Sequence, residues 1–228
     1  MKRILIATNI LTLFALGYLL YKKLHKKPPI FVKQSCSYSF EDIVPLFSKN
    51  NDSSTIIMLG DSRIKQGNWT QLLNSKSITN LGINGDKAYC ICKRLDIINK
   101  TKAKICFIEG GVMDLYTETP DSIVQSFKNI VSFCKQQNIV PVINCIVKIN
   151  SKASPYFKEA NLKIDTSNKI LIAFAKAQNI DYIDLNQFVV KDNLLSDEYT
   201  TDGSHFNAKA YNIWANEISP ILVKYNVK

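Results

Sequence analysis

The chain has 228 residues, of which 46% are hydrophobic and 21% charged, close to the averages of globular proteins. This length suits one α/β domain with a short appendage, and the absence of low-complexity tracts and repeats excludes fibrous and solenoid classes. Six of the 29 basic residues lie in residues 1–27, which contain no acid, and the others form no basic stripe, so the net charge of +10 does not predict nucleic-acid binding.

The N-terminal segment is the most apolar part of the chain. Ile4 to Tyr21 is an uncharged run of 18 residues, and a helix of that length spans about 27 Å, close to the thickness of a bilayer core. We therefore expect residues 1–27 to form a single-pass membrane anchor with basic flanks. A cleaved signal peptide is the alternative, but the run lacks the small residues of a cleavage site. Basic residues on both sides favour a cytoplasmic domain only weakly.

The six cysteines agree with that weak preference. Cys106 and Cys145 lie in apolar, strand-like runs where buried thiols are common. Cys90 and Cys92 have neither a second cysteine pair nor a nearby histidine. The sequence therefore predicts no metal site.

Residues 28–49 predict a linker and a short helix, and residues 50–228 a catalytic domain. In that domain, short apolar runs alternate with longer helical patterns. The expected strands cover residues 55–59, 78–81, 104–108, 140–146 and 182–185, and the expected helices cover 64–73, 87–99, 119–137, 155–178 and 207–225. This alternation predicts a parallel sheet with helices on both faces, whose ligand site lies at the carboxyl ends of the strands.

Gly60-Asp61-Ser62 follows the first expected strand and precedes a helix. The N–H groups of a helix N-terminus favour negative charge on a bound substrate oxygen, so Ser62 is a candidate nucleophile. The alternative is a turn in which Ser62 caps the helix.

Asp202 and His205 lie three residues apart in a polar loop before the last helix. This spacing lets Asp202 bind the imidazole Nδ1–H while Nε2 faces a nucleophile. His25, the other histidine, belongs to the lysine-rich membrane flank. A surface His beside a capping Asp is the alternative.

Two glycine-containing turns, Ile83–Asp86 and Glu109–Asp114, also follow expected strands. The N–H of Gly85 is a candidate donor to an oxyanion. A plain tight turn is the alternative in both places.

Together, these residues resemble the first, second and fifth conserved blocks of the SGNH/GDSL hydrolases. The resemblance covers residues 50–225 and implies a flavodoxin-like, three-layer α/β/α fold with a five-stranded parallel sheet. It implies Ser62 as nucleophile, His205 as general base and Asp202 as its orienting partner, with the N–H groups of Ser62 and Gly85 in the oxyanion hole. It also implies an acyl-serine intermediate and no cofactor.

The chain departs from the family at two positions. The family's third block, Gly-x-Asn-Asp, here contains Met113, which cannot donate a hydrogen bond to the oxyanion, and Asn84 is the alternative donor. Arg63 occupies a place where the family often has Leu or Ile. We expect substrate contacts from Asp61, Arg63, Met113 and Asp114.

The leading functional hypothesis is hydrolysis or transfer of an O-acyl group on a lipid or a carbohydrate. A binding module that has lost turnover through Met113 is the alternative, and the retained Ser62, Asp202 and His205 argue against it. A purely structural domain would need none of these motifs. The chain has no phosphate-binding loop or dinucleotide fingerprint.

Overall fold

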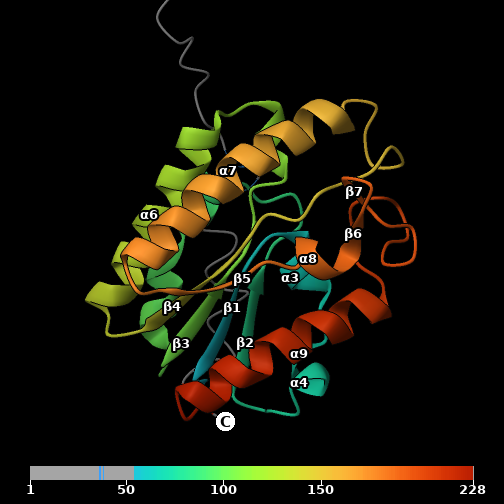
Figure 1. The fold of residues 1–228 in the computed structure, drawn as a ribbon. Helices are drawn as coiled ribbons and strands as arrows, with labels where there is room; N and C mark the ends of the chain where they lie inside the picture. Colours follow the sequence, from blue (N-terminus) through green and yellow to red (C-terminus); the bar gives the residue numbers. More distant parts are fainter. Residues whose placement is uncertain (1–35, 37, 39–53, 228) are drawn as a thin grey trace, which may run out of the picture. The chain divides into compact units, whose positions relative to one another are not determined.

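The centre of the protein is a parallel sheet. The computed structural model describes Cys36, Tyr38 and residues 54–227. Five strands lie in the order β2-β1-β3-β4-β5, and every neighbouring pair is parallel (Figure 1). The strands are β1 (Ile56–Gly60), β2 (Ile78–Gly82), β3 (Ile105–Ile108), β4 (Val140–Asn144) and β5 (Asp181–Ile183). Their carboxyl ends therefore meet at one edge, which we call the carboxyl edge.

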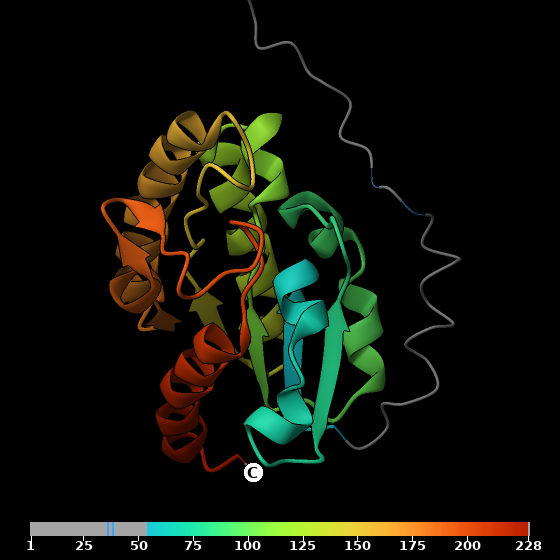
Figure 2. The ribbon, with the colours of Figure 1, turned by 90° about the vertical axis from the view of Figure 1, so that its right-hand side faces the viewer.

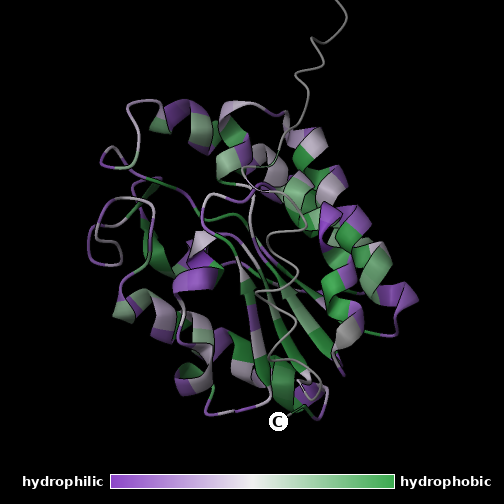
Figure 3. Ribbon diagram, turned by 180° about the vertical axis from the view of Figure 1, so that it is seen from behind, coloured by the Kyte–Doolittle hydropathy of each residue, from purple (hydrophilic) through white to green (hydrophobic). Residues whose placement is uncertain are grey.

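Helices cover both faces of the sheet, so the predicted three-layer α/β/α fold is confirmed (Figures 1 and 2). One face carries α5 (Ala88–Lys93), α6 (Pro120–Gln136) and α7 (Phe157–Ala177), and the other carries α4 (Trp69–Leu72) and α9 (Ala208–Lys224). Along β1, successive side chains pack into the hydrophobic cores on opposite faces of the sheet. Both faces are buried, so the strands are apolar almost throughout (Figure 3).

Three expected elements end earlier than their patterns suggested. The helix expected over 64–73 is two helices, α3 (Ser62–Gln66) and α4, because Gly67 is extended and Asn68 caps α4. The helix expected over 87–99 is α5 followed by a 3-10 helix, η1 (Leu95–Lys100). The strand expected over 140–146 stops at Asn144, whose side chain binds the Ile108 carbonyl and the Trp214 indole.

Short elements without a clear sequence signal lie between the long ones. A 3-10 helix, η2 (Met113–Tyr116), follows β3. A short helix, α8 (Asn186–Val189), precedes a two-stranded hairpin, β6 (Val190–Lys191) and β7 (Leu194–Leu195).

The cysteines divide into two groups. Cys106 and Cys145 are buried free thiols, as expected, whereas Cys36 forms a disulfide with Cys90 that the sequence did not predict. The expected membrane anchor and the short helix of residues 39–49 lie outside the described residues. Within the described part of the chain, no helix combines the length and apolarity needed to cross a bilayer.

Candidate active site

The turn after β1 places Ser62 at the carboxyl edge. The Asp61 side chain caps α3 by accepting a 2.9 Å hydrogen bond from Arg63 N–H, a contact that typically contributes about 1 kcal/mol. A Cβ atom on Gly60 would lie 2.7 Å from the Glu109 carbonyl oxygen, so this close approach requires glycine. As the first residue of α3, Ser62 has no helical acceptor for its N–H, and its side chain is partly exposed.

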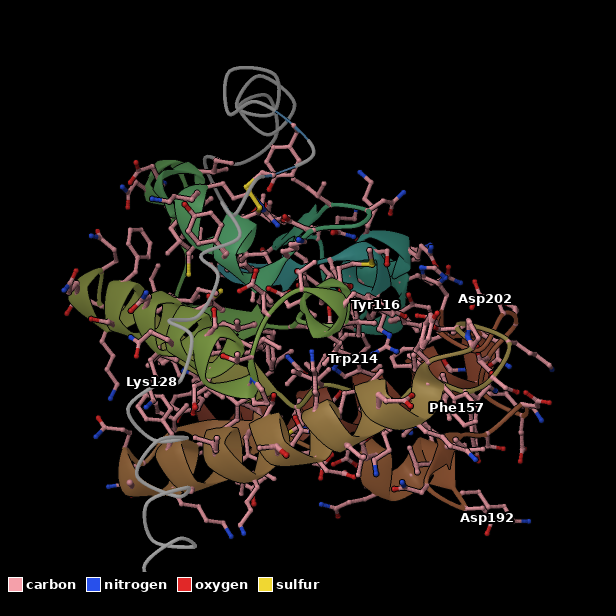
Figure 4. The ribbon with its side chains drawn as sticks, turned by 90° about the horizontal axis from the view of Figure 1, so that it is seen from above. Tyr116, Lys128, Phe157, Asp192, Asp202 and Trp214 are labelled. Atoms are coloured by element: carbon pink, nitrogen blue, oxygen red, sulfur yellow. A yellow bond between two sulfur atoms is a disulfide. The ribbon has the colours of Figure 1, made fainter. Side chains whose placement is uncertain are left out.

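The loop before α9 brings a base to this serine. Ser62 Oγ lies 3.0 Å from His205 Nε2, and His205 Nδ1 lies 2.6 Å from Asp202 Oδ2. The other Asp202 oxygen accepts backbone hydrogen bonds from Ser204 and His205, at 2.9 and 2.8 Å. Figure 4 looks onto this edge and labels Asp202. The three candidate residues thus form one hydrogen-bonded chain across 143 residues of sequence.

Asp202 is held in its charged form. Its partial burial raises its pKa, but the hydrogen bonds from the His205 ring and from the backbone of His205 and Ser204 outweigh this effect and lower the pKa to about 2. An ionised Asp202 favours the proton of a neutral imidazole on Nδ1. Nε2 is then free to accept the Ser62 hydroxyl proton.

The Gly85 turn lies against the nucleophile turn. The Ile83 carbonyl accepts a hydrogen bond from Asp86 N–H at 3.3 Å, and Gly85 has a φ of +71°. A Cβ on Gly85 would meet no atom within 4 Å, so backbone conformation, not space, favours glycine here. Ile83 N–H donates to the Gly60 carbonyl at 3.1 Å. This bond joins the turn that contains Gly85 to the turn that contains Ser62.

The match to a family model is decisive. Residues 52–213 match the model of the GDSL-like Lipase/Acylhydrolase family. The chain belongs to this family. The resemblance to the SGNH/GDSL hydrolases that the sequence motifs predicted is thereby confirmed.

Individual relatives are distant. A GDSL-like lipase from Bacteroides thetaiotaomicron has a TM-score of 0.70 at 19% identity, and the match covers 82% of this chain and 98% of that one. An acetyl xylan esterase has a TM-score of 0.62 at 19% identity, with 74% and 99% covered. At these identities the likeness shows the fold alone. An N-acylneuraminate cytidylyltransferase from Streptococcus agalactiae is 25% identical over 206 residues, which are 86% of this chain but only 45% of that enzyme.

The third GDSL block lies beside the site but differs in chemistry. Met113 begins η2 with a side chain 41% exposed. Asp114 is buried and caps α5 by accepting a 2.9 Å hydrogen bond from Ala88 N–H. Desolvation is the main cause that raises its pKa to about 6. Asp114 thus fixes the helix that follows the Gly85 turn.

Three predicted substrate contacts need correction. Asp61, Arg63 and Asp114 are only 2%, 1% and 1% exposed. Asp61 and Asp114 accept hydrogen bonds from N–H groups at the starts of α3 and α5, and Arg63 donates to the Ser204 and Val147 carbonyls. Met113 and Asn84 are exposed, and their contacts with substrate stay predictions.

Two buried charged residues near the site were missed. Arg94 pairs with Asp86 at 2.9 Å and donates to the Gly60 carbonyl at 2.9 Å, so it joins the two turns. Glu109 directly follows β3. Desolvation is the main cause that raises its pKa well above the usual range; the nearby Asp61 raises it further, and Arg63 lowers it. Glu109 carried one local signal, a charge placed directly after an apolar run, whereas Arg94 carried none.

Proposed function

We propose that this GDSL-like protein hydrolyses O-acyl esters of a neutral carbohydrate through an acyl-enzyme on Ser62. The observation that carries the proposal is the hydrogen-bonded chain from Ser62 through His205 to Asp202. A hydroxyl, an imidazole and a carboxylate in this order activate a serine for attack on an ester carbonyl.

The proposed reaction has two halves. Ser62 Oγ attacks the carbonyl carbon while His205 Nε2 takes the hydroxyl proton, and the N–H groups of Ser62 and Gly85 stabilise the oxyanion. The C–O bond to the sugar breaks as His205 returns the proton to the leaving alcohol. Water then attacks the acyl-serine with His205 again as base, and the acid and free Ser62 are released.

A groove between the end of α3, α4 and the start of α9 supports a carbohydrate substrate. It has a volume of about 630 Å³, and four carboxamides, two aromatic rings and two aliphatic side chains line it, those of Gln66, Asn68, Gln71, Asn212, Phe206, Tyr211, Leu72 and Ala208. Gln66 lies one helical turn after Ser62, and Phe206 follows His205 directly. No residue that lines the groove is charged. Amides and aromatic rings suit the hydroxyls and apolar faces of a neutral sugar.

The names of distant relatives include both substrate classes. The acetyl xylan esterase is named for an acetylated polysaccharide, and the Bacteroides thetaiotaomicron protein is named a lipase. These names describe those proteins, and the choice of a sugar over a lipid proposed here rests on the groove.

The substrate class can be tested with the full chain on acetylated xylo-oligosaccharides, p-nitrophenyl acetate and p-nitrophenyl palmitate. We expect the acetylated sugar to give the highest kcat/KM. Gln66→Ala and Asn212→Ala should raise KM for the sugar about 3- to 10-fold, because each removes about one hydrogen bond to a hydroxyl. The increase for p-nitrophenyl acetate should be several times smaller.

Gln125→Ala, an exposed amide on α6 across the sheet, is the matched control. A preference for the palmitoyl ester, or equal KM changes for both acetyl substrates, would contradict the carbohydrate proposal and leave ester hydrolysis intact.

We further propose that residues 4–21 anchor the chain in a membrane, with the catalytic domain on the oxidising side. The uncharged run and its basic flank support the anchor. The Cys36–Cys90 disulfide supports the oxidising side, because disulfides persist in such compartments and are rare in the cytosol. This side is opposite to the one weakly favoured by the flanking lysines.

Fractionation of cells that express the full chain tests this placement. The chain should stay with membranes after a carbonate wash, a shortened chain beginning at Pro28 should not, and a maleimide should label Cys36 and Cys90 only after reduction. A mature N-terminus beyond residue 20 would disprove the anchor. Labelling of both cysteines without reduction would disprove the oxidising side.

A further inference from the structure

Arg63 follows the nucleophile directly, yet its side chain turns into the protein and is only 1% exposed. Its Nε donates to the Ser204 carbonyl and its Nη1 to the Val147 carbonyl, both at 3.0 Å. Its Cζ lies 4.8 Å from the centroid of the Phe206 ring. Ser204 and Phe206 are the two neighbours of His205, so one guanidinium contacts the loop on both sides of the base.

We propose that Arg63 is a positioning residue that holds His205 at hydrogen-bond distance from Ser62. The inference rests on the proposed function, since it concerns the same serine and base. Ser62 and Arg63 are consecutive in the first turn of α3. A side chain that starts one residue from the nucleophile and binds both neighbours of the base fixes the two reacting groups relative to each other.

The backbone of Arg63 is itself fixed. Its N–H donates to Asp61 at 2.9 Å, and its carbonyl accepts from the Tyr211 hydroxyl at 2.6 Å. Tyr211 lies in the helix that the His205 loop enters. The side chain of Arg63 therefore extends from a fixed backbone. Because the guanidinium is planar and rigid, its hydrogen bonds fix the orientation of the His205 loop as well as its distance.

Burial of the Arg63 guanidinium costs desolvation free energy, whereas burial of an apolar side chain at this position would not. Within the described part of the chain, Nη2 of Arg63 has no hydrogen-bond partner. A buried, incompletely satisfied charge contributes little to stability. An aliphatic side chain here would fill space without that cost. Positioning of the base is a benefit that offsets it.

The loop has other contacts, so loss of Arg63 should loosen it without detaching it. Thr200 Oγ1 donates to the His205 carbonyl at 2.6 Å, and Asn150 N–H donates to the Gly203 carbonyl at 3.0 Å. A displacement of about 1 Å in a catalytic group can cost 10²-fold in rate. We therefore expect a partial loss of turnover, smaller than that from removal of Ser62.

The test compares Arg63→Leu, Arg63→Lys and the wild-type full chain by kcat and KM for p-nitrophenyl acetate and by the rate of fluorophosphonate labelling. Arg63→Leu should lower kcat and the labelling rate about 10- to 100-fold and change KM less than twofold. Arg63→Lys keeps the positive charge but lacks the planar guanidinium with its several donors, so its kcat and labelling rate should lie between those of Arg63→Leu and the wild type. Leu171→Ala, which removes a fully buried side chain on the opposite face of the sheet, should weaken the fold but retain kcat.

The outcomes separate the two ideas. A wild-type chain without labelling or hydrolysis would refute the proposed function. An active wild type with kcat unchanged in folded Arg63→Leu would refute only the role of Arg63. If Arg63→Leu does not fold, Arg63→Lys decides: wild-type turnover refutes the inference, and a reduced kcat at constant KM supports it.

Discussion

Ser62→Ala is expected to lower hydrolysis of p-nitrophenyl acetate about 10⁴-fold or more. The substitution removes the oxygen that would form the acyl-enzyme and leaves His205 without its proton donor at 3.0 Å. Kinetics and intact-mass analysis after fluorophosphonate treatment measure the effect, and one adduct per wild-type chain should be absent from the variant. A serine in the exposed turn of residues 151–153 gives the matched control, Ser151→Ala, which should react normally.

A Ser62→Ala chain that still carries the adduct, or hydrolyses within tenfold of the wild type, would place the nucleophile elsewhere. If only the adduct disappears while hydrolysis persists, Ser62 is reactive but is not the group that turns over this ester. Both results would overturn the mechanism proposed for the triad.

Met113→Asn is expected to raise kcat without lowering KM. The exposed Met113 lies at the start of η2 and offers no donor, whereas an amide there would bind an oxyanion that forms mainly in the transition state. One such donor contributes about 10²- to 10³-fold in rate when its geometry is right. Steady-state kinetics on p-nitrophenyl acetate measure the gain, and Met113→Leu, similar in size but without a donor, should show none.

Asn84→Ala separates two versions of this prediction. If Asn84 already stabilises the oxyanion, its loss should cost rate and Met113→Asn should add little. A large loss in Asn84→Ala with no gain in Met113→Asn would show that the oxyanion hole is complete. If neither the wild type nor Met113→Asn turns over any ester, the alternative of a binding module on a GDSL-like scaffold becomes the better account.

Much of the fold follows from local patterns. The strands begin and end within two residues of the expected limits, because buried parallel strands are apolar on both faces and end at polar residues or glycine. The errors arise where one residue overrides a pattern. Gly67 interrupts a helical period with an extended backbone, and Asn144 ends a strand by binding two groups that are distant in sequence.

The residues of the candidate site also differ in whether a local sequence pattern predicts them. Ser62 could be found because it follows a strand and precedes a helix, and Asp202 and His205 because they lie three residues apart in a polar loop. The direction of Arg63 could not, since its partners Ser204 and Val147 are 141 and 84 residues away. Asp61 did carry a signal, because an Asp two residues before the N–H that it caps is a common helix start. Cys36 and Cys90 pair across 54 residues with no local sign.

Cys92 lies two residues from that disulfide and still carries a free thiol. Its Sγ donates to the Ser126 carbonyl at 3.0 Å, and burial raises its pKa to about 12. Thiol–disulfide exchange needs a thiolate, and the raised pKa keeps Cys92 largely in its neutral thiol form near neutral pH. The neighbouring thiol is therefore a poor attacker of the Cys36–Cys90 bond. The folded structure thus places a free thiol close in sequence to the disulfide while holding that thiol in its less reactive form.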